Sequence, residues 1–237
     1  MKTVLQFTLL ATVIAASSAA HATLVTYDFT DTITSMFEYN GTTKAITNVT
    51  SSSMSGVAFS NGDTAHGTFS YDTATVLSPY YQPPAQAQGS YVLYYGPMSS
   101  TLTFDKSMFV YNSVSDGLIQ VADNASSFSG WDVFYLGTGA AYSPLTFQSM
   151  TLNLFDSSGQ VFSSAAVPRT LPLSGFSYAD VDYTWLRQSD GSQMHISSKI
   201  TSLEMEPSLP VPEPGTYTLL LGGLGLMGFM GRRRKFS

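Results

Sequence analysis

The middle of the chain alternates short β-type runs with turn sequences, and this rhythm limits the folds that it can adopt. Val25, Tyr27 and Phe29 alternate with polar residues, as in a strand that buries one face. About eleven such runs follow one another, separated by turn signals such as Asp190-Gly191. Because no stretch keeps a helical period, the sequence predicts an all-β domain over residues 23–206, a single β-sandwich of jelly-roll type.

The first 22 residues have the order of a secretory signal peptide. Lys2 supplies the positive start, residues 4–16 are apolar, and the small residues that end in Ala22 suit a cleavage site. A first core helix is the alternative, but the small residues lead directly into strand-like sequence. We therefore predict a signal peptide over residues 1–22 and export of the domain that follows.

An uncharged apolar stretch, residues 216–231, is followed at once by Arg232, Arg233, Arg234 and Lys235. A helix of this length spans about 24 Å, against roughly 30 Å for the hydrocarbon core of a bilayer. Snorkelling arginines and local thinning of the bilayer can make up the difference. The four cations favour a cytoplasmic C-terminus. We therefore predict a transmembrane helix over residues 216–231 and a cytoplasmic tail over residues 232–237.

A proline-rich linker, residues 207–215, joins the predicted domain to the predicted span. Its central residues are Val211, Pro212, Glu213 and Pro214. Each proline fixes its own φ and disfavours helix in the residue before it, so the segment stays extended. An extended segment at a membrane surface can enter the cleft of a processing enzyme. The alternative interpretation is a stiff spacer between domain and anchor.

The proline–glutamate–proline sequence, the apolar span and the basic cluster, in this order, resemble the PEP-CTERM sorting signal of Gram-negative bacteria. The resemblance covers Val211 to Lys235. It implies that the protein is a client of an exosortase, a membrane enzyme that recognises such tails and cuts near the motif. It also implies an inner-membrane-anchored precursor, a mature form at the cell surface or outside the cell, and an association with exopolysaccharide.

The predicted exported domain is strongly acidic. Residues 23–210 contain fifteen Asp and Glu against five Lys and Arg, a net charge of about −10. This charge argues against nucleic acid and anionic lipid surfaces as partners and is compatible with neutral glycans, cations or basic proteins. The chain has no cysteine, which excludes disulfides, thiolate zinc sites and cysteine-based catalysis.

Few residues of the domain suit catalysis or metal binding. His66 and His195 stand in no recognisable nucleophile or zinc pattern, so we expect both on strand faces. Asp180 and Asp182 would share one strand face, about 7 Å apart. There they could bind Ca²⁺ or serve as acid and base in glycoside hydrolysis, the alternative being a solvated edge. We expect no other cofactor.

Tyrosines gather around a proline-rich stretch near residue 80. Tyr80, Tyr81, Tyr94 and Tyr95 could stack on sugar rings, although most aromatic residues of a sandwich belong to its core. Three functions therefore stay open: a non-enzymatic surface or matrix protein associated with exopolysaccharide or biofilm, a carbohydrate-binding module, and a secreted glycan hydrolase. The complete sorting signal and the absence of a recognisable catalytic pattern favour the first.

Overall fold

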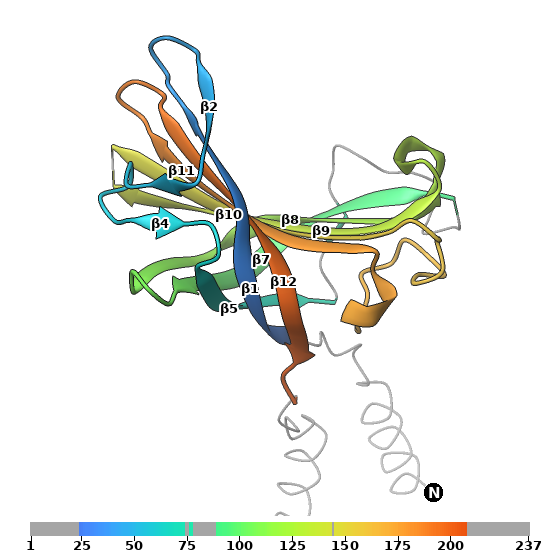
Figure 1. The fold of residues 1–237 in the computed structure, drawn as a ribbon. Coiled ribbons are helices and arrows are strands. Elements are labelled where there is room, and N and C mark those ends of the chain that lie inside the picture. The colour runs from blue at the N-terminus through green and yellow to red at the C-terminus, as the bar shows by residue number, and fades with distance from the viewer. Residues whose placement is uncertain (1–23, 74–75, 78–88, 144, 208–237) are drawn as a thin grey trace, which may run out of the picture. The chain divides into compact units, whose positions relative to one another are not determined.

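The computed structural model describes four ranges of the chain, residues 24–73, 76–77, 89–143 and 145–207 (Figure 1). Residues Thr23–Glu206 form one compact unit. In chain order its strands (β) and 3-10 turns (η) are β1 (Leu24–Tyr39), β2 (Ile46–Val49), β3 (Ser51–Ser52), β4 (Phe59–Ser60), β5 (Thr64–Asp72), β6 (Val76–Leu77), β7 (Tyr91–Phe104), β8 (Phe109–Ala125), η1 (Ser126–Phe128), β9 (Trp131–Ser143), β10 (Thr146–Asp156), η2 (Leu173–Gly175), β11 (Tyr178–Arg187) and β12 (Gln193–Met205). The prediction of an all-β fold is confirmed.

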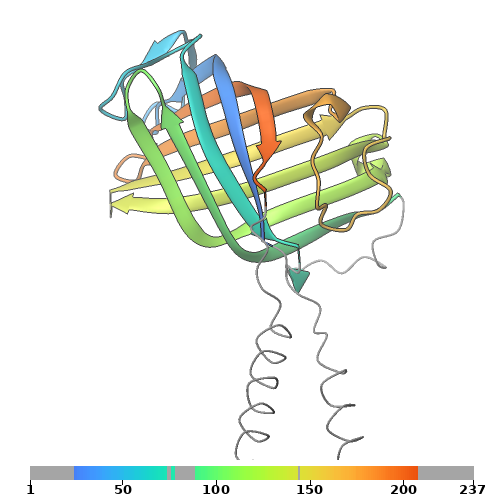
Figure 2. The same ribbon diagram turned by 90° about the horizontal axis from the view of Figure 1, so that it is seen from below.

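Eight of these strands close into a barrel. β1, β5, β7, β8, β9, β10, β11 and β12 follow one another around it, each antiparallel to its neighbours, and β12 pairs with β1. In Figure 2, β1 (blue) and β5 (teal) run steeply down the view, whereas β9 and β10 (yellow-green to yellow) run nearly across it. β2 adds to β1 and β6 adds to β7, while β3 and β4 pair with each other. Closure protects the edges of the eight main strands, because each has two neighbours.

The expected jelly-roll sandwich is wrong. A jelly roll divides its strands between two sheets joined by crossing connections. Here the strands that follow one another around the barrel also follow one another along the chain, and the first pairs with the last. The fold is therefore one closed sheet with up-and-down connectivity.

Glycine and proline inside two long strands explain the difference. Gly96 and Pro97 of β7 lie opposite Gly117 and Asp116 of β8, in the middle of strands that the sequence pattern divides into shorter runs. A Cβ atom on Gly117 would lie 2.6 Å from the backbone oxygen of Gly137, so the backbones approach closely there. Such residues can mark a bend within a strand as well as a turn between strands.

Aromatic rings from several strands fill the interior of the barrel. Tyr27 and Phe29 point inward, as the sequence alternation predicts. The ring of Tyr27 stacks on Phe69 with 5.2 Å between centroids, and Tyr71 packs against Phe134 at 5.6 Å. All five side chains are almost completely buried. Their burial stabilises the fold, because large aromatic groups remove much apolar area from water.

The connection from β10 to β11, residues 157–177, is fastened to this core. Ala165 and Leu171 are buried with the barrel residues. Three hydrogen bonds join buried tyrosine hydroxyls to the backbone of the connection: Tyr71 donates to Pro168 O at 2.8 Å, Tyr94 donates to Ala165 O at 2.7 Å, and the Leu171 amide donates to the Tyr27 hydroxyl at 2.7 Å. The connection is therefore held against the barrel, and it positions η2 and the start of β11.

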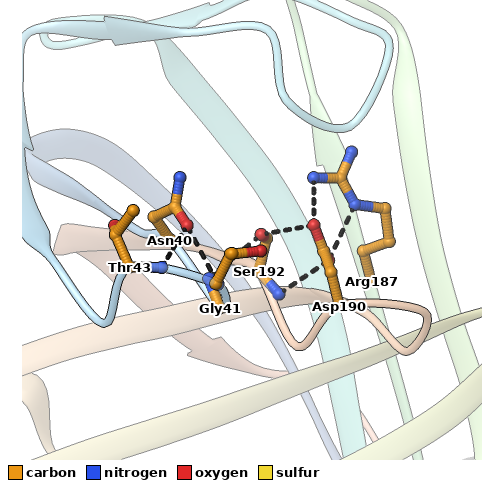
Figure 3. Close-up of polar contacts among 7 residues, drawn as sticks. Asn40, Gly41, Thr43, Arg187, Asp190 and Ser192 are labelled. Carbon is orange, nitrogen blue, oxygen red and sulfur yellow. Dashed lines mark hydrogen bonds and ion pairs between the residues drawn. The ribbon is translucent and has the colours of Figure 1, made fainter.

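Two turns lock together beside the β1–β12 seam (Figure 3). The Gly41 amide donates to the Ser192 hydroxyl at 3.2 Å, and this hydroxyl donates to the Asp190 carboxylate at 2.9 Å. Arg187 binds the same carboxylate through two contacts of 3.0 and 2.8 Å. The hydrogen bonds from Arg187 hold the pKa of Asp190 well below its usual range. A Cβ atom on Gly41 would lie 1.8 Å from the Asp190 backbone oxygen.

We expect Gly41→Ala to destabilise the protein by about 1–3 kcal/mol, because the added methyl group must push the two turns apart. Urea unfolding followed by tryptophan fluorescence measures this loss. Thr43→Ala is the matched control in the same turn: its side chain is exposed, and the change should cost less than about 0.5 kcal/mol. Equal losses in the two variants would contradict the tight packing at Gly41.

Candidate functional site

Several predicted sites lie outside the described residues. They are the sorting motif Val211, Pro212, Glu213 and Pro214, the basic residues Arg232, Arg233, Arg234 and Lys235, the tyrosines Tyr80 and Tyr81, the signal peptide at 1–22 and the span at 216–231. In the part of the chain that the structure describes, no helix has both the length and the apolar character needed to cross a membrane. The signal peptide and the span therefore stay predictions.

The structure separates Tyr94 from Tyr95. They are consecutive in β7, so their side chains point to opposite faces of the sheet. Tyr94 is 3% exposed and donates its hydroxyl to Ala165 O at 2.7 Å, whereas Tyr95 is 51% exposed. The expectation that Tyr94 contacts a glycan is therefore corrected: its ring belongs to the core and cannot stack on a sugar.

Asp180 and Asp182 share the outward face of β11. Val181 between them points into the core, and the two aspartates lie opposite Lys199 and Ser197 of β12. Strand alternation therefore places the two carboxylates as the sequence predicts.

The two carboxylates have different surroundings. The Asp182 carboxylate accepts hydrogen bonds from Asn153, at 3.0 Å, and from the Ser197 hydroxyl. Asp180 is only 6% exposed, and its Oδ2 accepts a 2.8 Å hydrogen bond from the Tyr178 hydroxyl. Its Oδ1 is buried and has no hydrogen-bond partner among the described residues. Both oxygens of Asp182 are thus hydrogen-bonded, while the buried Oδ1 of Asp180 has no such partner.

Burial raises the pKa of Asp180 to about 6, and the charge of Asp182 adds to this shift. The hydrogen bonding of Tyr178 and the nearby Asn153 amide acts in the opposite direction. At neutral pH the group is therefore mostly ionised and accepts hydrogen bonds. Within the described residues, no three His, Cys, Asp or Glu side chains are grouped so that they could hold a metal ion.

Asp180 lines a groove of about 450 Å³, which we call the Asp180 groove. It lies where β1, β11 and β12 meet the end of the β10–β11 connection. Hydroxyl groups and one ammonium group border it, from Thr34, Ser177, Tyr178 and Lys199, and Leu173 and Phe176 add apolar surface. A buried carboxylate among neutral donors, one cation and apolar surface can bind a small polar group.

Next to the groove, three aromatic side chains from neighbouring strands form a second depression of about 330 Å³, the aromatic hollow. Its residues are Trp131 of β9, Phe155 of β10 and Tyr178 of β11. Trp131 is 42% exposed and Tyr178 is 54% exposed. The Phe155 and Tyr178 rings lie 5.9 Å apart between centroids. Exposed aromatic surface gathered in one place is typical of a binding site.

The aromatic hollow was not predicted from the sequence. Trp131, Phe155 and Tyr178 are far apart in the chain: Trp131 and Tyr178 begin β9 and β11, and Phe155 lies one residue before the end of β10. The strand pairing brings Phe155 opposite Tyr178, a pairing that neither strand reveals by itself. Their only signal in the sequence is an aromatic residue beside a turn, which is equally typical of core packing.

Both histidines lie on outward strand faces, as expected. His66 Nδ1 lies 2.6 Å from Asp105 Oδ1. His195 stacks on Phe37 with 4.5 Å between ring centroids and lies within 2.9 Å of the Thr184 hydroxyl. Burial lowers the pKa of His195, against the influence of the Asp182 charge. These contacts link neighbouring strands, so both side chains have a structural role.

Residues 210–235 match the family model described as the PEP-CTERM protein-sorting motif. Comparisons with curated proteins and with solved structures give no match. This motif is a sorting signal, which implies an exported protein that is processed at a membrane.

More particularly, the chain carries the PEP-CTERM signal itself, which implies recognition by an exosortase. The resemblance seen in Val211 to Lys235 is confirmed. The match covers the tail alone, so what the barrel binds must be argued from the barrel.

Proposed function

We propose that this protein is a non-enzymatic component of the cell surface or extracellular matrix of a Gram-negative bacterium, associated with exopolysaccharide or biofilm. An exosortase would process the membrane-anchored precursor and release or attach the barrel. The observation that carries the proposal is the sorting motif at residues 210–235. The net charge of about −10 over residues 23–210 supports a partner that is not anionic.

Carbohydrate binding by the barrel is the second candidate function. It is supported by the aromatic hollow, where Trp131 and Tyr178 are about half exposed. Aromatic rings offer apolar faces, and Tyr and Trp also carry a polar group at the edge, which suits ligands with both kinds of surface. Binding of this kind would hold the mature protein in a polysaccharide layer without chemical change of the glycan.

A secreted glycan hydrolase is the least favoured candidate. A pair of carboxylates acts as acid and base only when both can reach the glycosidic bond or its water. Asp180 lines the groove, but Asp182 does not border it, and its oxygens are engaged with Asn153 and Ser197. This arrangement favours binding over hydrolysis.

The sorting proposal predicts that Pro212→Ala with Pro214→Ala leaves the precursor unprocessed in its native host. Without the prolines the motif no longer stays extended and can join the helical span, so it should not enter the processing enzyme. Mass spectrometry of the C-terminus and membrane fractionation measure the outcome. Pro207→Ala, in the same linker but before the matched motif, is the control and should be processed normally. Normal processing of the double variant would refute the proposal.

A further inference from the structure

We infer that the outer face of β9 to β12 binds an uncharged polysaccharide at two adjoining subsites. One sugar ring lies on the aromatic hollow, and the next sugar donates a hydroxyl group to Asp180 in the Asp180 groove. The inference rests on the proposed association with polysaccharide and adds the place, the charge class and the minimum length of the ligand.

The first subsite follows from the exposure of the aromatic hollow. Trp131 is 42% exposed and Tyr178 is 54% exposed. Many other aromatic side chains of the barrel are buried in its core. The three hollow residues come from three adjacent strands, so they form a broad, shallow depression. The apolar C–H face of a sugar ring has the size and flatness to cover such a surface.

The second subsite follows from the unpaired oxygen of Asp180. A buried acceptor without a hydrogen bond is unfavourable, and a ligand that supplies a donor removes this cost. Asp180 Oδ1 is such an acceptor, and Asp180 lines the groove. Lys199, opposite Asp180 on β12, borders the same groove and supplies a donor. A sugar with neighbouring hydroxyl groups can satisfy both, because each hydroxyl donates and accepts.

Tyr178 joins the two subsites. Tyr178 lines both the aromatic hollow and the Asp180 groove. Its hydroxyl donates to Asp180 Oδ2 at 2.8 Å, which ties the ring to the carboxylate. A ligand that fills both depressions must therefore pass over Tyr178. A chain of at least two sugars can do this, whereas a single sugar reaches one depression only.

Charge decides against the other polysaccharides. The domain is strongly acidic, and Asp182 stands beside Asp180, so a uronic-acid polymer would be repelled. A polymer of cationic sugars would meet Lys199 in the same groove as Asp180. Local balance of one carboxylate and one ammonium group fits an uncharged ligand with hydroxyl groups.

The test uses the full chain purified in a detergent without a sugar headgroup. Isothermal titration calorimetry compares four neutral polymers, a β-glucan, a mannan, a galactan and a xylan, with polyuronate and chitosan. At high salt, where the net charge of the domain is screened, we expect at least one neutral polymer to bind and the two charged polymers not to bind. Fragments of two or more sugars of that polymer should bind at least about tenfold more tightly than the monosaccharide, because only they occupy both subsites.

Variants test the site itself. Tyr178→Ala should abolish binding and Trp131→Ala should weaken it at least about tenfold, because aromatic anchors dominate such sites. Tyr178→Phe keeps the ring and should retain most of the binding. Tyr39→Ala, a partly exposed tyrosine at the end of β1 that lines neither the groove nor the hollow, is the matched control and should bind as the unchanged protein does. Thermal melting confirms that each variant is folded, and Trp131→Ala remains informative if Tyr178→Ala is not.

Each contrary result overturns the inference. These results are no binding of any neutral polymer, binding of polyuronate or chitosan only, equal affinity for the monosaccharide, and full binding by folded Trp131→Ala. Failure here is distinguishable from failure of the sorting proposal. If the glycan site fails, the proline variants still accumulate as precursor; if the sorting proposal fails, they are processed while glycan binding persists.

Discussion

Replacing Asp31 by Asn should make the protein about 2–4 kcal/mol more stable at pH 8, with little change at pH 4. Asp31 lies on the inward face of β1, at a register shift in its pairing with β12, and is 1% exposed. Neither carboxylate oxygen has a direct hydrogen-bond partner among the described residues. Burial raises the pKa of Asp31 to about 7; the nearby Ser198 hydroxyl opposes the shift and the charge of Asp105 adds to it.

The direction follows from the two protonation states. In the unfolded chain Asp31 loses its proton near its ordinary value of 3.8, whereas in the folded barrel it keeps the proton up to about pH 7. Its favourable contribution to folding is therefore fully present below pH 4 and is lost as the pH rises from about 4 to 7. A shift of this size corresponds to a free energy on the order of 4 kcal/mol. Asparagine cannot ionise, so it avoids this loss.

Urea unfolding at pH 4, 6 and 8, followed by the fluorescence of Trp131 and Trp185, measures the difference between the two proteins. Other carboxylates change stability with pH in both proteins, so only the difference is informative. Asp28→Asn is the control, because Asp28 lies on the same strand with its side chain exposed. A gain that is equal at pH 4 and pH 8, or a loss at pH 8, would contradict the buried ionisation.

Gly67→Ala should destabilise the barrel by about 3 kcal/mol or more, because the position has no room for a methyl group. Gly67 is an inward position of β5, opposite Phe29 of β1 and Leu102 of β7. A Cβ atom there would lie 2.1 Å from the backbone oxygen of Thr101 and 2.7 Å from the Phe29 ring. The ring could turn aside, but the backbone oxygen belongs to a paired strand, so β5 and β7 would have to separate.

Thr103→Ala is the matched control for Gly67→Ala. Thr103 lies on β7 opposite His66, on the outward face, and its truncation should cost less than about 1 kcal/mol. Both variants are compared with the unchanged protein by urea unfolding at one pH. A Gly67→Ala protein within about 1 kcal/mol of the unchanged one would show that the strands part easily there, contrary to the close packing of the barrel.

The C-terminal sorting signal could be predicted from the sequence alone. A sorting signal is read as a linear segment, so Pro212, Glu213 and Pro214 with the apolar span and the basic cluster are recognisable without a fold. The strand alternation was equally local: Tyr27 and Phe29 point inward as their pattern predicts. The shared face of Asp180 and Asp182 followed from the same period of two.

The wrong predictions concern features that depend on how several strands pair. Gly96, Pro97 and Gly117 look like turn residues, but they lie inside β7 and β8, which pair without interruption there. Tyr94 and Tyr95 are adjacent in sequence, yet one is buried and the other half exposed. Which face of a strand points inward depends on the neighbouring strands. Where the residues of both faces are similarly polar, the local sequence does not predict which face is buried.

By itself, the sequence determined the β-rich character of the domain, its acidity and its sorting signal, because these depend on composition and on contiguous residues. Only the tertiary structure decided that β1 pairs with β12 to close a barrel, that Asp180 is buried with an unpaired oxygen, and that Trp131, Phe155 and Tyr178 meet in one hollow. These features join strands distant in the chain, and long-range pairing depends on how all the strands pack together.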